Sequence, residues 1–464
     1  MWPIRVLLPS DVFPPRSGGA GWSAHALALG LIDRGYVVSA VVPRRTTKDQ
    51  RRKTKGQARD VGPSSFVFRP TVGDVLGVPT VWVDYWAPRI PIVQNYFRYE
   101  RFWPYLADVL VEEANRSAIS DPQSLIIHAQ HVQTAPAAIV AGWRLGAPVV
   151  VTVRDHWPWD YFSTGLHGDR IPYGRQTWSA LATDLMARLG PARGALALPA
   201  IPYMLAHLRR RRSALRQADA VIAVSDYVAR RLAGLVAPER LHVIPNMVDL
   251  AAVDATIATP QTTVPPGTPY LLFVGKLERN KGAHLLIEVF RELKALGVGS
   301  WGLGVGEGRS LPSPTSQLPS PVLVVAGSGP LRTELQRELA GLGVRARFLD
   351  WVEHDEVLRL MAGCELLLFP SAWGEPLSRV PLEASACGAA ILAMPTGGTP
   401  SIIANTVNGA LEATPAGFAR RMRALLAQPE QRRALGLAAR RNAERRFAKD
   451  IVIGQVEELY QSLL

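Results

Sequence analysis

The sequence predicts an α/β protein made of two αβα domains in tandem. Apolar, strand-like runs alternate with helical patterns along all 464 residues, which is typical of parallel sheets covered by helices on both faces. The alternation is interrupted at 255–269 by the stretch ATIATPQTTVPPGTP, whose Thr and Pro content is typical of a domain boundary. A composition of 48% hydrophobic and 20% charged residues is that of a globular protein, and this length can form two sizeable cores.

The first domain is expected to open with a strand at 4–9, a tight loop at 17–21 and a helix at 22–34 that Gly35 closes. The next strand is expected at 37–42. Four further buried strands, which would complete one doubly wound domain, are expected at 125–129, 148–153, 220–224 and 241–244.

The second domain repeats the pattern after the boundary. Its strands are expected at 270–274, 322–326, 347–349, 366–369 and 390–393, with helices between them. From about residue 430 the sequence is helical and has no turn cluster strong enough to start another domain, so it is expected to pack as a tail. We therefore divide the chain into an N-terminal domain at 1–256, a C-terminal domain at 257–445 and a terminal helix at 446–464, which packs back toward the first domain.

Two stretches depart from the alternation. Residues 297–320 are rich in Gly, Ser and Pro, so they predict a flexible surface insertion. The glycine run at 304–308 follows no strand, and a phosphate loop is therefore not indicated. Residues 157–217 combine aromatic, apolar and basic character and include the run Arg209–Arg212. This segment is the best candidate for contact with a membrane surface or an acceptor.

Bulk features exclude several classes of protein. The opening residues lead straight into a strand without a basic leader or cleavage site, so we expect a cytoplasmic protein. No window reaches the ~18 uninterrupted apolar residues that a spanning helix needs, and the nearest, 194–208, contains two prolines. Cys364 and Cys387 have no partner at metal-ligand spacing, so the sequence suggests neither a zinc site nor a disulfide scaffold. The formal charge of +13 favours anionic ligands, but no nucleic-acid recognition module accompanies it.

The strongest motif is FPSAWGEPLSRVPLEA at 369–384. A buried strand ends at its start, and a helix is expected to begin near Ser378, with Pro381 tolerated in the first turn. The free amides and positive dipole end of such a helix suit a diphosphate. Glu375 and Glu383 would flank this position and accept hydrogen bonds from sugar hydroxyls. The alternative is an ordinary N-cap beside two solvated acids.

Each predicted domain has one weaker motif after its first strand. The stretch FVGKLERNKG at 273–282 places Lys276 and Lys281 at the carboxyl edge of the sheet, where α/β proteins bind ligands and a cation can neutralise a leaving diphosphate. Solvated surface lysines are the alternative. In the first domain, Gly18 and Gly19 would let the backbone approach phosphate or sugar, although the full G-x-G-x-x-G spacing is missing.

Taken together, these motifs resemble the GT-B fold glycosyltransferases of family GT4. The glycine loop, the G-[RK]-L-x-x-x-[KR]-G motif and the E-x7-E motif stand in the family's order across nearly the whole chain. Further matches are LIIH at 125–128, VTVRD at 151–155, VIAVS at 221–225, VIPNMVD at 243–249, AGSGP at 326–330 and the glycine pair at 397–398. The resemblance implies two Rossmann-like domains facing across a cleft, the first on the acceptor side and the second on the nucleotide-sugar donor side.

The resemblance also implies roles for matching residues. Glu375 would bind hydroxyls of the donor sugar, Glu383 the ribose of the nucleotide, and Lys276 and Lys281 the negative charge on the departing diphosphate. The other implied donor contacts are the backbone amides of Leu377, Ser378 and Arg379, the glycines Gly18, Gly19, Gly275 and Gly327, and the turn at Val352 near the base.

Members of this family retain anomeric configuration and need no metal, so the resemblance implies no cofactor besides the nucleotide diphosphate sugar as co-substrate. The leaving phosphate oxygen can take the acceptor's proton, so a protein base is not required. The chain departs from the family pattern at Lys276, where many relatives have Arg, at Ser401, where an acidic residue is common, and at Arg154, where many have His. Arg154, Asp155 and His156 are expected on the acceptor side, with a structural role as the alternative.

The acceptor is the least specified part of this interpretation. Residues 158–212 favour a glycan or lipid-linked acceptor of cell-surface polysaccharide biosynthesis, reached in peripheral contact with the anionic inner membrane face. A solvated basic face is the alternative. Rival functions are a catalytically inactive nucleotide-sugar-binding protein, a nucleotide-sugar epimerase and a phosphorylase. The intact Glu375, Glu383, Lys276 and Lys281 argue against a decayed site, and neither rival enzyme explains the combined motifs.

Overall fold

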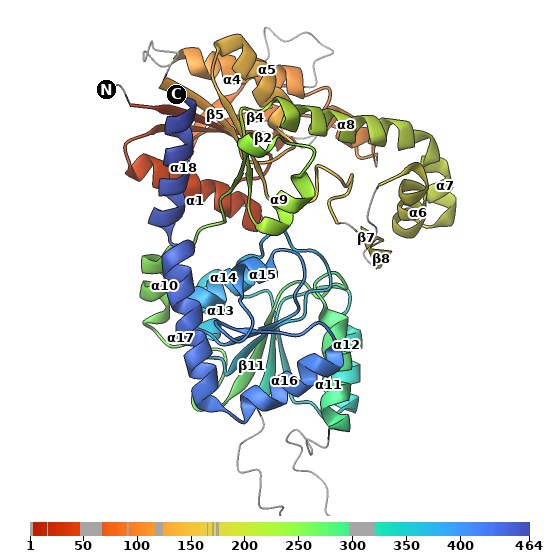
Figure 1. Ribbon diagram of the computed structural model, residues 1–464. Coiled ribbons are helices and arrows are strands. Elements are labelled where there is room, and N and C mark those ends of the chain that lie inside the picture. The colour runs from red at the N-terminus through yellow and green to blue at the C-terminus, as the bar shows by residue number, and fades with distance from the viewer. Residues whose placement is uncertain are drawn as a thin grey trace, which may run out of the picture. The chain divides into compact units, whose positions relative to one another are not determined.

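The computed structural model describes residues 3–15, 17–46, 67–90, 92–116, 124–164, 166–168, 171–172, 176–296 and 321–464. The chain forms two compact units (Figure 1). The first contains Met1–Gly168, Tyr173–Met247 and Asp450–Leu464, and the second contains Val248–Lys449 with the short stretch Asp169–Pro172. The insertion expected at 297–320 lies outside the described residues.

The sheet of the first unit has eight strands in the order β10-β9-β6-β5-β1-β2-β4-β3. Neighbours pair in parallel except β3 and β4, which form an antiparallel hairpin around Leu76 and Gly77, both with positive φ as a tight I′ turn requires. Four of the five β3 residues are exposed, so β3 carries no apolar signature, and the sequence did not predict it. The strands are β1 (Arg5–Pro9), β2 (Val37–Arg45), β3 (Thr71–Val75), β4 (Val78–Tyr85), β5 (Leu125–Ala129), β6 (Val149–Val153), β9 (Ala220–Ala223) and β10 (Leu241–Val243).

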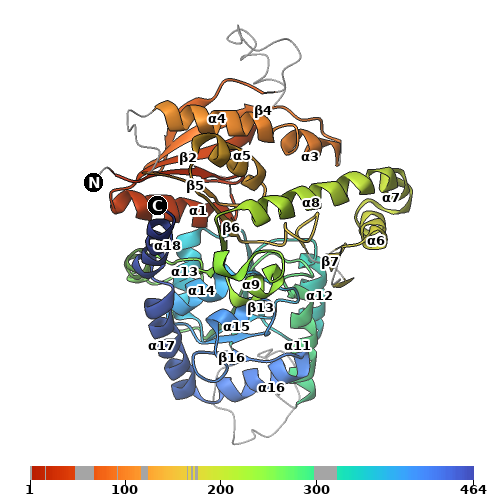
Figure 2. The same cartoon turned by 45° about the horizontal axis from the view of Figure 1, so that its top comes forward.

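Helices cover both faces of this sheet (Figure 2). On one face, α1 (Gly19–Asp33) and α18 (Lys449–Leu463) share a core with the strands, to which Leu27, Leu31 and Tyr460 contribute. The C-terminal helix therefore belongs to the first unit. The other face is covered by α4 (Trp103–Arg116), α5 (Ala135–Leu145) and α8 (Ile201–Gln217). Shorter elements are α3 (Val93–Arg98), α6 (Trp178–Leu189), α7 (Pro191–Ala197), α9 (Asp226–Leu232) and the 3-10 turns at Leu198–Ala200 and Pro238–Arg240.

Helix α1 corrects the prediction of a loop at 17–21. The helix begins at Gly19 instead of residue 22, and Gly18 is its N-cap. A Cβ added at Gly21 would lie 2.5 Å from Ser17 Oγ and 3.2 Å from Phe13 Cα, whereas one at Gly18 would meet nothing within 4 Å. Close packing of this turn therefore requires a glycine at position 21.

The most apolar window, 194–208, does not form one helix. It is divided among α7, the 3-10 turn at Leu198–Ala200 and α8, because Pro199 and Pro202 each lack a backbone donor and begin a new segment. Among the helices that the structure describes, none is long and apolar enough to cross a membrane.

The sheet of the second unit has six parallel strands in the order β13-β12-β11-β14-β15-β16. Leu271, Phe273 and Leu368 lie in a core that α11 (Ala283–Ala295), α12 (Arg332–Gly341) and α16 (Pro415–Leu426) cover from one face. The other face is covered by α13 (His354–Gly363), α14 (Arg379–Ala386) and α17 (Pro429–Arg446) (Figure 1). The strands are β11 (Tyr270–Val274), β12 (Val322–Ala326), β13 (Ala346–Asp350), β14 (Leu366–Phe369), β15 (Ile391–Ala393) and β16 (Ala410–Leu411).

Part of the stretch interpreted as a domain boundary is helical. Helix α10 (Leu250–Ile257) is N-capped by the Asp249 side chain, which accepts from the Ala252 amide at 3.0 Å. The two units divide before this helix, between Met247 and Val248. The Thr- and Pro-rich segment that follows α10 belongs to the second unit.

The predicted α/β fold with two parallel sheets is confirmed, and each sheet has one point where the strand order reverses. From β1 the chain proceeds to β2 on one side and later returns to β5 on the other. From β11 it proceeds to β12 and later returns to β14. In open α/β sheets, ligands bind outside the carboxyl ends of the strands at such a switch point. The fold therefore marks one candidate position in each unit.

Candidate active site

At the switch point of the second unit, backbone segments pack closely because glycines follow the strands. The Gly275 amide, directly after β11, donates to the Ala326 carbonyl at 3.0 Å. Gly327 has φ +146, and a Cβ there would lie 1.9 Å from the Gly275 oxygen. Two of the predicted donor-site glycines thus allow neighbouring loops to meet at the strand ends, whatever ligand they also contact.

Glu375 and Lys281 meet beside the ends of β11 and β14. Lys281 Nζ donates to Glu375 Oε1 at 2.6 Å, and Ser371 Oγ donates to the same oxygen at 3.2 Å. The Lys281 ammonium also lies 4.9 Å from the centre of the Trp373 ring, a cation–π distance. The Glu375 side chain is 6% exposed, whereas that of Lys281 is 27% exposed, so the lysine links a buried carboxylate to the surface.

The glycine pair at 397–398 holds the Glu375 backbone. The Gly398 amide donates to the Glu375 carbonyl at 2.6 Å, and a Cβ at Gly397, where φ is +56, would lie 2.2 Å from that oxygen. The position of the Glu375 carboxylate is therefore fixed from both its backbone and its side chain. Lys276, by contrast, is exposed and makes no hydrogen bond or ion pair with a described residue of this group.

Helix α14 begins where the sequence predicts, with Ser378 as N-cap, although the Ser378 side chain makes no capping hydrogen bond. Glu383 lies one turn into this helix and is 6% exposed. Its Oε1 accepts from Arg379 Nε at 2.9 Å, from the Arg379 guanidinium NH2 at 2.7 Å and from His354 Nε2 at 3.1 Å. Arg379, predicted through its backbone amide alone, thus orients Glu383 through its side chain.

The charges around Glu383 outweigh its burial. Burial alone would raise the pKa of this carboxyl, but the hydrogen bond from His354 and the charge of Arg379 hold the pKa below its ordinary value. The same hydrogen bond raises the pKa of His354. Glu383 is therefore ionised, which makes it a strong acceptor for hydroxyl donors. Together with Lys281 and the N-terminus of α14, it forms a position that can bind an anion and neighbouring hydroxyls.

At the switch point of the first unit, a histidine and an acid follow neighbouring strands. His131 Nδ1 lies 3.1 Å from Asp11 Oδ1 and 3.3 Å from Ser10 Oγ. His131 is 2% exposed, and its Nε2 has no hydrogen-bond partner among the described residues. Burial would raise the pKa of Asp11, but the charge of His131 and its hydrogen bond lower it. The imidazole is therefore oriented by an ionised acid and keeps one nitrogen for another group.

The three residues predicted on the acceptor side have different surroundings. Arg154 donates to Asn246 Oδ1 at 2.6 Å and to Gln130 Oε1 at 2.8 Å, and the buried His156 accepts from Trp159 Nε1 at 3.0 Å. Asp155 lies within electrostatic range of His131, and burial raises its pKa to about 6. Burial therefore alters the acid–base chemistry of Asp155.

The sequence analysis assigned neither Asp11 nor His131 nor His354 to the site. A signal for Asp11 and His131 existed, since each stands two residues beyond a predicted buried strand, at the ligand-binding edge. His128, which lies within β5, is a true core histidine: its ring nitrogens lie 2.7 Å from the hydroxyls of Tyr460 and Thr152, and burial lowers its pKa to about 3. No spacing in the sequence connects His354 to Glu383.

Two protein families match the chain in succession. The family described as Glycosyltransferase Family 4 matches residues 17–252, and Glycosyl transferases group 1 matches residues 255–442. Within the described residues, no three His, Cys, Asp or Glu side chains are grouped as metal ligands would be.

Curated relatives are 26–29% identical to the chain over the matched segments. The alpha-maltose-1-phosphate synthase of Mycolicibacterium smegmatis is 27% identical over 284 residues, which are 54% of this chain and 65% of that protein. Spore coat protein SA of Bacillus subtilis is 29% identical over 206 residues, or 42% and 49%. The D-inositol 3-phosphate glycosyltransferase of Segniliparus rotundus is 26% identical over 254 residues, or 53% of each. The matches thus span about half to two thirds of these relatives.

Solved structures share the fold over the whole chain. Anabaena Alr3699/HepE in complex with UDP superposes with a TM-score of 0.62 at 17% identity, covering 99% of this chain and 100% of that one. Sucrose-phosphate synthase from Thermosynechococcus elongatus superposes with a TM-score of 0.58 at 20% identity, covering 99% of each. These neighbours establish the architecture.

Proposed function

The chain belongs to glycosyltransferase family 4, and from that membership we propose that it transfers a sugar from a nucleoside diphosphate sugar to a glycan or lipid-linked acceptor. One observation carries the proposal most strongly. Buried Glu375 is held by Lys281 beside the N-terminus of α14, at the switch point of the second sheet. An anion position next to an oriented carboxylate suits a molecule that joins a diphosphate to a sugar.

The donor would lie across the ends of β11 and β14. The diphosphate would accept hydrogen bonds from the α14 amides at Leu377–Arg379, and Glu375 would accept them from sugar hydroxyls. Glu383, ionised and held by Arg379 and His354, would accept from the ribose hydroxyls. The UDP and UDP-glucose complexes of the structural neighbour Alr3699/HepE support a nucleotide-sugar donor.

The reaction would proceed with retention and without a metal. The bond between the anomeric carbon and the diphosphate oxygen breaks, and its electron pair stays on the diphosphate. The acceptor hydroxyl oxygen bonds that carbon from the same face, and its proton passes to the leaving phosphate oxygen. Lys281, Lys276 and the dipole of α14 would stabilise the charge that a divalent cation neutralises in other sugar transferases.

The first unit would supply the acceptor side, with Gly18 and Gly19 near the donor and Asp155 and His131 near the acceptor. The relatives named for maltose 1-phosphate and inositol 3-phosphate support a hydroxyl-bearing acceptor. We place the protein in cell-surface polysaccharide biosynthesis, in the cytoplasm and in peripheral contact with the inner membrane face through 158–212. The acid-free sequence from Leu185 to Ala218, with its arginines, supports contact with anionic lipid.

A panel of nucleotide sugars tests the proposal. The full-length protein is incubated with each donor, with and without EDTA, and release of nucleoside diphosphate is measured. We expect release with at least one donor, unchanged by EDTA, and a product that retains the anomeric configuration by NMR. Glu375→Gln should abolish release, whereas Glu292→Gln, at an exposed position of α11, should not.

Each outcome decides one part of the proposal. Donor binding without transfer or hydrolysis for the whole panel would favour a nucleotide-sugar-binding protein instead of an enzyme. Loss of activity in EDTA would overturn metal independence while leaving the transferase proposal intact. An inverted product would overturn retention alone.

A further inference from the structure

A pocket lined by arginines lies on the first unit. Its volume is about 330 Å³, and its walls come from the loop after β6, the last turns of α8 and the end of α9. The polar side chains that line it belong to Arg212, Arg216, Arg231 and Trp159, and no acidic residue lines it. The remaining lining residues are Pro158, Ala233, Gly234 and Leu235.

Two of the arginines are held in place by the loop after β6. Arg212 Nε donates to the Pro158 carbonyl at 2.8 Å, and the Arg231 guanidinium stacks 4.8 Å from the centre of the Trp159 ring. Arg216, one helical turn after Arg212, is exposed. Neither Arg216 nor Arg231 forms an ion pair with a carboxylate in the described part of the chain.

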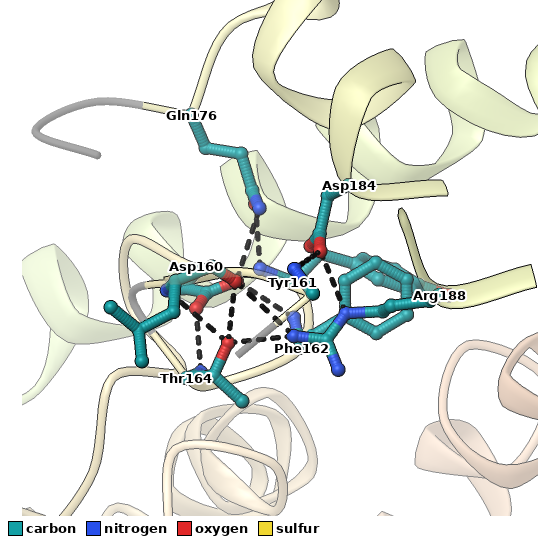
Figure 3. Close-up of polar contacts among 9 residues, drawn as sticks. Asp160, Tyr161, Phe162, Thr164, Gln176, Asp184 and Arg188 are labelled. Carbon is teal, nitrogen blue, oxygen red and sulfur yellow. Dashed lines mark hydrogen bonds and ion pairs between the residues drawn. The ribbon is translucent and has the colours of Figure 1, made fainter. Parts of the chain in front are cut away.

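This loop is rigidly supported (Figure 3). The fully buried Asp160 accepts from the amides of Phe162 at 2.8 Å and Thr164 at 2.6 Å, and from Gln176 Nε2 at 3.0 Å. Asp184 accepts from Arg188 Nε at 2.8 Å. Because Asp160 directly follows Trp159, this network fixes the wall of the pocket before any ligand binds, which reduces the entropy cost of binding.

The three guanidinium groups line a cavity that no acidic residue lines, which favours the entry of an anion. No Asp or Glu occurs between Asp184 and Asp219, so helix α8 cannot supply a counter-ion, and the acid of α9, Asp226, does not line the pocket. Guanidinium groups match the oxygens of phosphate bidentately, and they do so better than lysine. The indole of Trp159 adds an apolar wall on which an organic group attached to the phosphate can pack.

We propose that this arginine pocket binds a phosphate or diphosphate group, which under the proposed function belongs to the acceptor. The assignment rests on that function in one respect only: the pocket shares the loop after β6 with Asp155 and His156, the predicted acceptor-side residues. The chemistry of the pocket itself is independent of the donor site.

Inorganic pyrophosphate is the probe for the soluble form of this ligand. Binding is measured by calorimetry on the full chain with the donor site saturated by nucleoside diphosphate. The test variant is Arg216→Ala/Arg231→Ala, and the matched control is Arg209→Ala/Arg230→Ala, which removes equal charge from exposed positions of the same two helices. We expect the test variant to weaken pyrophosphate binding roughly tenfold for each guanidinium removed and the control to bind as the unaltered protein does.

Phosphatidylcholine vesicles with and without phosphatidic acid form the second arm. Binding that needs both phosphatidic acid and the pocket arginines would assign the phosphate to a lipid headgroup. Pyrophosphate binding without vesicle binding would assign it to a soluble acceptor. Equal binding of both probes by test variant and control would overturn the proposal, as would absence of binding to either probe.

The same variants separate this proposal from the proposed function. Thermal unfolding and nucleoside diphosphate binding confirm that the test variant is folded. If donor hydrolysis persists and the test and control variants bind pyrophosphate equally, the pocket assignment fails and the transferase proposal stands. If no donor is used but pyrophosphate binding depends on Arg216 and Arg231, the anion site stands and the transferase fails.

Discussion

The two switch points differ in how their titratable side chains are held. In the second unit, Glu375 is paired with Lys281, and Glu383 accepts three hydrogen bonds from Arg379 and His354. In the first unit, His131 Nε2 and both side-chain amide atoms of Gln133 are buried without a partner among the described residues. Buried polar groups in folded proteins are nearly always paired. Asn280 Oδ1 and Thr399 Oγ1 of the second unit are also buried without a partner in the described part of the chain. The two carboxylates at the second switch point are thus held by cations, whereas His131 at the first keeps one nitrogen for a ligand.

Replacing Lys281 should cause the largest loss of turnover, and it tests the switch point of the second unit directly. In Lys281→Met, turnover should fall about 10²–10³-fold, because the oriented charge that would stabilise the leaving diphosphate is lost. Lys276→Met should cost clearly less, since Lys276 is exposed and has no contact with Glu375. Steady-state rates with the preferred donor give both values. Equal losses for the two lysines would show that the pairing with Glu375 is irrelevant to catalysis.

Replacing Glu383 should cause the next largest change, which is a loss of nucleotide affinity and not of turnover. Glu383→Gln should weaken binding of the nucleoside diphosphate about tenfold, because a charge-assisted hydrogen bond becomes a neutral one. Calorimetry with the nucleotide and its 2′-deoxy form isolates the ribose contact. The unaltered protein should discriminate between the two, and the variant should not. Undiminished discrimination would remove Glu383 from the ribose site.

The pH dependence of stability in an Asp155 variant tests the switch point of the first unit. Its raised pKa, about 6, means that the folded state binds the proton more tightly than the unfolded state does. Stability from this group is therefore full at low pH and is lost as pH rises through about 6. Asp155→Asn should stabilise the protein by about 1–2 kcal/mol near pH 8 and have little effect near pH 4. Urea unfolding at both pH values measures this, and equal effects would contradict the buried-carboxyl assignment.

The difference between the two switch points also explains which features the sequence could predict. Strands that are continuous apolar runs, such as Leu125–Ala129 and Leu366–Phe369, have the bounds that their sequence indicates. Glu375 and Glu383 stand in one continuous motif, and the ordered combination of this motif with the others predicted their donor role through the family resemblance. Asp11 and His131 are far apart in sequence and become neighbours only because β1 and β5 pair. The Asp160 network and the arginine pocket depend on loop geometry that no spacing encodes.

Replacing His354 should cause the smallest change, and it tests how Glu383 is held at the switch point of the second unit. Its pKa is raised by the hydrogen bond to Glu383, so its stabilisation is present below the unfolded pKa and is lost as pH rises through the folded value. The His354 side chain is 59% exposed, and solvent screening reduces the contribution to about 0.5 kcal/mol. His354→Gln should therefore lower the unfolding free energy near pH 6 and leave it unchanged near pH 9. Because Arg379 also holds Glu383, nucleotide affinity should change less than in Glu383→Gln, and an equal loss would make His354 the principal support of that carboxylate.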